Sequence, residues 1–259
     1  MLIAECGIDR MMRIGLAAVG FKDKDIDYNK NTIINLMKQY SGNADMLVFG
    51  ESFLQGFEVL TWKYEEDKYI AKELTDAVIT EISEKAKQYG IAVSFGFIEN
   101  DNKTEELHST QITIGDDGKI VNVFRRVSEG WKEGDAINNL HYTEGREFPK
   151  FTYKGYNFSV GLCGDFWYDD NADSVKNMNV DAVLWPVYTD YNAEEWNNKV
   201  CYEYEEQAGK IGKKVLLVNS VCLNRKNDET ASGSASAIIN GKINRYLPAG
   251  EEGVLVIEI

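Results

Sequence analysis

Residues 158–165 read FSVGLCGD, an apolar run that ends in Cys163. Residues 45–51 read DMLVFGE and have the same form, with Glu51 after the apolar run. A short, continuous apolar run bounded by glycine and polar residues is typical of a strand that is buried on both faces of a sheet. We therefore predict two buried strands, each of which ends in an ionisable side chain.

The rest of the chain repeats this pattern, because short apolar runs alternate with longer amphipathic stretches. Such alternation predicts an α/β fold. The expected strands are 13–19, 45–49, 91–98, 158–162, 181–185 (ended by Pro186), 214–219 and 253–257, and the expected helices are 29–40, 71–89 and 196–211. Hairpins are expected at the turns Asp117-Gly118 and Asn240-Gly241, since such dipeptides favour tight turns. Hairpins together with α-to-β alternation predict mixed sheets.

The chain has 259 residues, and no linker rich in proline, glycine or serine divides it. We therefore expect one domain over residues 12–259. Residues 1–11 are expected to be an N-terminal extension, because Met11 and Met12 directly precede the first strand. The N-terminus does not resemble a secretory signal, and no apolar run approaches the roughly 18–20 residues that span a bilayer, so a cytoplasmic protein is predicted.

The composition argues against several classes of function. The net charge is −14 and the acidic residues are spread along the chain, so neither nucleic acid nor an anionic membrane is an expected partner. The four cysteines are widely spaced without a C-x-x-C pair, and neither of the two histidines lies in a known metal-binding or triad motif. Free thiols are expected, and no metal site is expected.

Glu51, Arg126 and Cys163 each follow closely after an apolar strand. Side chains at the carboxyl ends of strands converge over the sheet, where α/β proteins bind ligands. A cysteine thiol is mostly protonated at neutral pH, so Cys163 needs a base within hydrogen-bond reach, and Glu51 is the candidate. Negative charge that develops on an attacked amide or nitrile is stabilised by a fixed cation and a backbone N–H.

In this order and spacing, the three residues resemble the Glu–Lys–Cys triad of the nitrilase superfamily of carbon–nitrogen hydrolases. The resemblance covers residues 12–259. Five blocks in the right order carry it: VFGESFLQGF at 48–57, VGLCGD at 160–165, DAVLWP at 181–186, LVN at 217–219 and GSASAII at 233–239. Each block alone is weakly specific, whereas five in order are specific.

The resemblance implies a four-layer α-β-β-α sandwich with mixed sheets. It implies that Glu51 is the base, that Cys163 is the nucleophile through a thioester, and that the N–H of Gly164 stabilises the oxyanion. It also implies a small-molecule amide substrate, no cofactor or metal, and a homodimer or larger homo-oligomer. Amidase activity is the default expectation, since nitrile hydrolysis is rare among chains with this resemblance.

The chain departs from the family pattern at the catalytic lysine. After the Asp-Gly-Lys turn at 117–119, the strand leads into Arg125 and Arg126, which places Arg126 at the lysine position. Lys132 is a second candidate, but it needs a register shift or a loop that reaches back. Arginine prefers to clamp a carboxylate with two donors. Arg126 could therefore lock Glu51 in an ion pair, or it could steady the oxyanion in a wider pocket, and the sequence is compatible with both.

Two functions are compatible with these residues. The first is cysteine-dependent hydrolysis of a non-peptide carbon–nitrogen bond in a small amide, with Arg126 and Gly164 as oxyanion stabilisers. The second is a catalytically impaired family member that binds a small molecule or a partner, with Arg126 neutralising Glu51. Aromatic residues after strand ends are more often part of a core, but three are expected to contact the substrate: Trp167, Trp185 and Tyr188.

Overall fold

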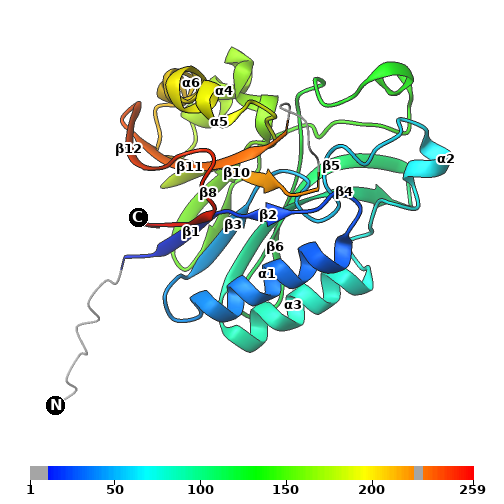
Figure 1. Ribbon diagram of the computed structural model, residues 1–259, viewed down its shortest axis with the longest axis horizontal. Coiled ribbons are helices and arrows are strands. Elements are labelled where there is room, and N and C mark those ends of the chain that lie inside the picture. The colour runs from blue at the N-terminus through cyan, green and yellow to red at the C-terminus, as the bar shows by residue number, and fades with distance from the viewer. Residues whose placement is uncertain (1–10, 225–229) are drawn as a thin grey trace.

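The computed structural model describes residues 11–224 and 230–259. All of the predicted N-terminal extension except Met11 lies outside these residues, as does Cys6. No helix in the described ranges is long and apolar enough to cross a membrane. Two β-sheets pack against each other, and helices cover their outer faces (Figure 1).

The first sheet has six strands in the order β13-β1-β3-β4-β5-β6. Their bounds are β1 (Arg13–Ala18), β3 (Met46–Phe49), β4 (Ala92–Asp101), β5 (Glu106–Ile114), β6 (Ile120–Arg125) and β13 (Gly253–Glu258). Strands β1, β3 and β4 are parallel neighbours. The other three strands pair antiparallel, so this sheet is mixed.

The second sheet has seven strands, of which six follow the order β12-β11-β10-β9-β8-β7 while β2 pairs with β10. Their bounds are β2 (Gly20–Phe21), β7 (Phe151–Tyr153), β8 (Tyr156–Val160), β9 (Ala182–Val187), β10 (Val215–Cys222), β11 (Ser232–Ile239) and β12 (Lys242–Leu247). Strands β8, β9 and β10 are parallel neighbours, and β7, β11 and β12 pair antiparallel. The prediction of mixed sheets is confirmed.

Helices lie on both outer faces. The first sheet is covered by α1 (Ile26–Tyr40) and α3 (Ala77–Tyr89), and the second by α4 (Asp169–Lys176) and α6 (Cys201–Ile211) (Figure 1). The short helical segments are α2 (Tyr64–Asp67), α5 (Ala193–Glu195), the 3₁₀ segments η1 (Gly134–Asn138) and η2 (Cys163–Trp167), and the π-helical η3 (Trp196–Val200). The layer order is α-β-β-α, as predicted.

Alternate residues of the central strands enter different hydrophobic cores. In β1, Leu16 packs in the core that contains residues of both sheets, whereas Ala17 packs in the core under α1 and α3. In β3, Val48 and Phe49 divide in the same way. Because successive side chains of a strand point to opposite faces, a strand buried on both faces needs an apolar residue at every position. The continuous apolar runs in the sequence have this origin.

The prediction that Pro186 ends its strand is wrong, because β9 continues to Val187. Pro186 is paired with Val218 of β10. The last residue of β9 that pairs with β8 is Leu184, so the edge of β9 beyond it is open on that side. A proline lacks the N–H that a ladder needs, and it is tolerated where one strand edge has no partner.

The helix predicted over residues 71–89 begins only at Ala77. The carboxylate of Asp76 accepts a hydrogen bond from Val78 N at 3.0 Å and caps the helix. A cap satisfies one of the N–H groups that the first turn leaves without a partner, so it fixes the first residue more sharply than the apolar pattern does. The predicted end at Gly90 is confirmed, with the left-handed φ of 61°.

Candidate active site

Glu51 lies where the two sheets meet. It follows β3 of the first sheet, and its N–H donates to the carbonyl of Val187 in the second sheet at 3.3 Å. The backbone turn after Glu51 approaches β4 so closely that a Cβ on Gly96 would overlap with Ser52 N. The side chain of Glu51 is 1% exposed. Both sheets therefore fix its position, and water hardly reaches it.

The two oxygens of the Glu51 carboxylate have different surroundings. Oε1 accepts a hydrogen bond from Ser109 Oγ at 2.8 Å and one from Arg126 Nη1 at 3.1 Å. Oε2 is buried and has no hydrogen-bond partner among the residues that the structure describes. One oxygen is thus held in place, while the other keeps its capacity to accept a hydrogen bond.

Arg126 directly follows β6, and its N–H donates to Ser109 O at 2.9 Å. Its side chain is 5% exposed, and its Nε donates to Ser128 Oγ at 2.9 Å. Burial is the largest single effect and lowers the pKa of Arg126, but Glu51, Cys163 and Asp165 together raise that pKa above its ordinary value. The guanidinium is therefore a fixed cation beside Glu51.

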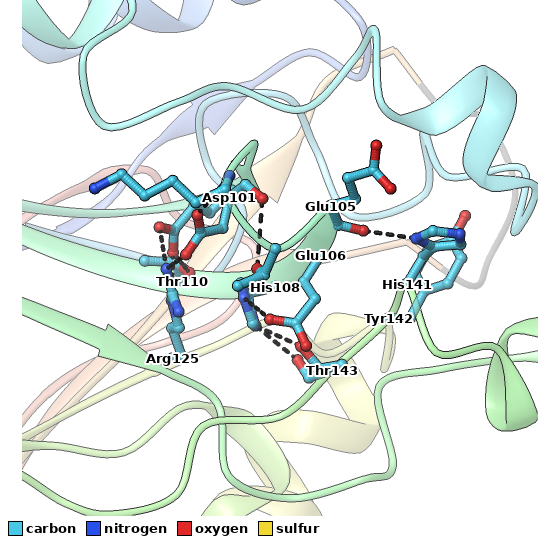
Figure 2. A network of polar contacts seen from close by, with 12 residues as sticks. Asp101, Glu105, Glu106, His108, Thr110, Arg125, His141, Tyr142 and Thr143 are labelled. Atoms are coloured by element: carbon cyan, nitrogen blue, oxygen red, sulfur yellow. Dashed lines mark hydrogen bonds and ion pairs between the residues drawn. The ribbon is translucent and has the colours of Figure 1, made fainter.

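The preceding residue, Arg125, does not reach Glu51. Its guanidinium donates to Glu99 at 2.9 and 2.7 Å and to Asp101 at 2.9 Å. Figure 2 shows Arg125 in this network, near His108, whose Nδ1 lies 2.9 Å from Thr143 O. The network is separate from Glu51: it pairs the partly exposed Arg125 with the buried Glu99. Of the two arginines, Arg126 is the one at the site.

Lys132, the second candidate for the lysine position, is engaged elsewhere. Its Nζ forms an ion pair with Glu144 at 2.7 Å and donates to Tyr142 O at 3.3 Å. Its side chain is 10% exposed. An amine held by these two acceptors is not part of the polar cluster around Glu51.

Cys163 begins η2 shortly after the end of β8 at Val160, and its φ of 41° lies in the left-handed region. For a residue with a side chain, such a conformation costs about 1–3 kcal/mol and is kept only where the surroundings enforce it. Here the indole Nε1 of Trp185 donates to Cys163 O at 2.9 Å. The thiol donates to Tyr188 O at 3.2 Å. The backbone strain and these two contacts define where the sulfur lies.

The thiol of Cys163 is strongly held in its protonated form. Burial raises the pKa of Cys163 to about 12, and the negative charge of Glu51 adds to this effect, whereas Arg126 acts in the opposite direction. The three groups thus lie within electrostatic reach of one another. Because the reactive form of cysteine is the thiolate, this sulfur needs a base at neutral pH.

Asp165 ties the Arg126 loop to the Cys163 turn. Its Oδ1 accepts from Val127 N at 3.0 Å and from Ser128 N at 2.7 Å, and its Oδ2 accepts from Leu162 N at 2.8 Å. Burial raises the pKa of Asp165 to about 6, although these backbone donors favour the ionised form. At neutral pH the carboxylate is charged and joins loops from both sheets.

Gly164 lies directly against the guanidinium. A Cβ added to Gly164 would lie 2.6 Å from Arg126 Nη2, a distance that real Cβ contacts do not show. In the described chain, Nη2 is the one nitrogen of this guanidinium without a hydrogen bond. It therefore lies free over the backbone that follows the cysteine.

The three aromatic residues expected at the substrate pocket differ in burial. Trp185 is fully buried and supports the backbone of Cys163 through its indole. Tyr188 is partly buried, stacks on Phe57 and supplies the carbonyl that accepts from the thiol. Trp167 is 44% exposed and packs edge-on against Tyr204. Trp185 thus acts on the protein itself, whereas Trp167 and, to a smaller extent, Tyr188 keep surface that is exposed to solvent.

Sequence reasoning missed Ser109, Ser128 and the acceptor role of Asp165. Ser109 contacts Glu51 across 58 positions of the chain, and Ser128 carries no motif of its own. The sequence showed Asp165 as part of a Cys-x-Asp block. Its three hydrogen bonds could not be predicted, because they join loops that only the fold brings together.

A surface pocket of about 500 Å³ borders the site. It is lined by residues 127–129 and 168–171, and it reaches the polar cluster through Ser128, since neither Glu51 nor Cys163 lines it. Among the described residues, no group of three or more His, Cys, Asp or Glu side chains is arranged to hold a metal ion.

Proteins of known sequence are similar to this chain at low identity. The glutamine-dependent NAD(+) synthetases of Acinetobacter baylyi and Aquifex aeolicus are 22% and 21% identical over 68% and 96% of this chain. The matches cover 31% and 42% of those two proteins, so the chain spans less than half of their length. An (R)-stereoselective amidase from Pseudomonas is 20% identical over 67% of this chain and 59% of its own.

Among solved structures, an amidase of the nitrilase superfamily from Nesterenkonia superposes with a TM-score of 0.77, at 17% identity over 96% of this chain and 90% of its own. A variant of that amidase carries the acetamide moiety of fluoroacetamide covalently on its active-site cysteine. The NAD+ synthetase of Acinetobacter baumannii has a TM-score of 0.75 at 19% identity, and the match covers 95% of this chain and 45% of that one. The model of the carbon-nitrogen hydrolase family matches residues 13–259, and this chain therefore belongs to that family.

Proposed function

We propose that this protein hydrolyses the carbon–nitrogen bond of a small linear amide through a thioester on Cys163. The observation that carries the proposal is the unequal environment of the Glu51 carboxylate. Arg126 and Ser109 both bind Oε1, and the buried Oε2 keeps no partner within the described residues. A carboxylate clamped through both oxygens would be a poor base, whereas this one retains a free acceptor.

In the first half of the reaction, Glu51 Oε2 takes the proton of Cys163 as Sγ leaves its hydrogen bond with Tyr188 O and attacks the amide carbon. The oxyanion is stabilised by the N–H of Gly164 and by Arg126 Nη2. When the carbon–nitrogen bond breaks, Glu51 returns the proton to the leaving nitrogen, which departs as ammonia or an amine. A fixed donor of this kind typically lowers such a barrier by about 2.7–4 kcal/mol.

In the second half, Glu51 removes a proton from a water molecule that attacks the thioester carbon. The tetrahedral intermediate collapses to a carboxylic acid, and the sulfur regains its proton. Each turnover thus consumes one amide and one water. Trp167 and Tyr188 are the proposed substrate contacts, and the predictions of a cytoplasmic location and a homodimer stay predictions.

The competing function is that of a binding protein in which Arg126 neutralises Glu51. The ion pair at 3.1 Å favours it, because arginine is a strong partner for a buried carboxylate. The two functions differ in one measurable property. In the hydrolase Glu51 activates the thiol of Cys163, whereas in the binding protein it does not.

A thiol-labelling experiment separates them. We would treat the wild-type chain, Glu51→Gln and the exposed control Glu84→Gln, on the outer helix α3, with iodoacetamide at pH 7 and map the labelled peptides by mass spectrometry. We expect Cys163 to react faster than Cys201 and Cys222, and Glu51→Gln to slow it about 100-fold, the scale of general-base assistance. The control should leave the rate unchanged. Equal rates at Cys163 in wild type and Glu51→Gln would rule out the proposed mechanism. Ammonia release from acetamide, absent in Cys163→Ala, is the companion assay.

A further inference from the structure

The guanidinium of Arg126 contacts Glu51 with a single nitrogen. Arginine usually binds a carboxylate with two parallel N–H groups, which is its strongest geometry. Here Nη1 alone reaches Oε1 of Glu51, at 3.1 Å. A contact of two guanidinium nitrogens with Glu51 would also occupy Oε2. The contacts that prevent it therefore keep Oε2 free.

Two neighbours limit the guanidinium. Ser128 Oγ accepts from Nε at 2.9 Å, so the Nε edge is occupied. Nη2 lies over Gly164, at a place where even a methyl group would not fit. A rotation that brought Nη2 toward Glu51 would pull Nε away from Ser128 and leave this buried donor without a partner, at about 1–3 kcal/mol.

The hydroxyl of Ser128 is itself fixed. Ser128 is 4% exposed, and its N–H donates to Asp165 Oδ1 at 2.7 Å. Asp165 in turn holds Leu162 N beside the nucleophile turn. The acceptor that Arg126 uses thus belongs to a rigid chain of contacts that runs from the Cys163 turn to Glu51.

We propose that Ser128 is a positioning residue that allows an arginine at position 126 to coexist with a working base. By holding Nε, it restricts Arg126 to one contact with Glu51 and keeps Oε2 available for the thiol proton. The inference rests on the proposed function, in which Glu51 is that base. Lysine has no Nε–H and acts as a point charge, so a chain with lysine at position 126 would not need Ser128 for this purpose.

The test is a double-mutant cycle of wild type, S128A, R126K and R126K/S128A, each checked for folding by thermal unfolding. The readout is the rate of Cys163 alkylation by iodoacetamide from pH 6 to pH 10. We expect S128A to slow alkylation at pH 7 about 100-fold and to move the profile to higher pH, because the thiol loses its base. In the R126K chain the same change should alter the rate by no more than about twofold, the usual error of additivity. An equal effect of S128A in both chains, or no effect in either, would overturn the inference.

A second comparison does not depend on the lysine variants. S128T keeps a hydroxyl at this position, so its alkylation rate should lie within about twofold of wild type. A rate as slow as that of S128A would contradict the hydroxyl's role. If instead E51Q labels like wild type, the proposed function itself fails. If E51Q slows the alkylation of Cys163 but S128A has the same effect on the rate in the wild-type and R126K chains, the proposed function stands and only the role of Ser128 is rejected.

Discussion

At position 126, an arginine needs more hydrogen-bond acceptors and more space from its neighbours than a lysine would. Its planar guanidinium is larger than an ammonium. Each of its buried N–H groups needs either a hydrogen-bond acceptor or a position in which no acceptor is required. Nη1 uses Glu51, Nε uses Ser128, and Nη2 lies over Gly164. The residue that departs from the family pattern is therefore accommodated by a serine and a glycine.

This arrangement predicts the effect of Gly164→Ala. The added Cβ would lie 2.6 Å from Arg126 Nη2, so the guanidinium must move, and we expect kcat for amide hydrolysis to fall about 100-fold. The matched control is Gly130→Ala, whose Cβ would lie 4.0 Å from the same nitrogen in ordinary contact. Steady-state kinetics of both variants check this. Unchanged kcat in Gly164→Ala would show that the guanidinium takes no part in turnover.

At the scale of elements, the site depends on loops that come from different sheets. Arg126 follows β6 of the first sheet, and Cys163 follows β8 of the second. Asp165 connects them through three backbone N–H groups, all with distances of 3.0 Å or less. The carboxylate thus ties the loop that carries Arg126 to the turn that carries Cys163, although it has no step in the proposed reaction.

Asp165→Ala should therefore lower both stability and activity. Three buried donors lose their acceptor, so we expect the free energy of unfolding to fall by roughly 3 kcal/mol or more. The exposed Asp170 lies five positions further on, and Asp170→Ala is the matched control, with an expected change within about 0.5 kcal/mol. Urea unfolding measures both. Similar midpoints for the two variants would contradict the clamp.

At the scale of the whole molecule, burial acts on several weak acids in the same direction. Burial raises the pKa of Cys163 to about 12 and that of Tyr246 to about 12. Burial also raises the pKa values of Tyr142, Tyr153 and Tyr204 above the ordinary range of a phenol. Each of these groups keeps its proton in the folded chain at a pH at which the unfolded chain has lost it.

The sign of the pH effect follows from this difference. Where the folded state binds more protons, the free energy of unfolding falls as pH rises, by about 1.4 kcal/mol per pH unit for each group. The loss begins near the ordinary values of 9.0 for a thiol and 10.0 for a phenol. Urea unfolding at pH 8, 9, 10 and 11 should show the decline. In Tyr142→Phe the slope between pH 10 and 11 should be shallower, and a slope parallel to wild type would contradict the assignment.

Much of the architecture can be predicted from local patterns of apolar and polar residues in the sequence. Continuous apolar runs arise because strands such as β1 and β3 are buried on both faces, so they were found directly. The first and last residues of some elements could not be predicted in this way. The start of α3 is set by the cap at Asp76, and β9 continues through Pro186 because β8 does not pair with it there. Such boundaries depend on individual contacts and not on periodicity.

Apolar periodicity along the sequence determined an α/β fold with mixed sheets, because it is a local property of the chain. The ordered motifs, through their resemblance to the nitrilase superfamily, gave the four-layer sandwich and the candidates Glu51, Arg126 and Cys163. Only the tertiary structure decided that Arg126 and not Lys132 reaches Glu51, and that it does so through one nitrogen. The reason is geometric. A hydrogen bond between residues 75 positions apart depends on where the first sheet places the loops after β3 and β6 to within a fraction of an ångström, and no pattern along the chain records that placement.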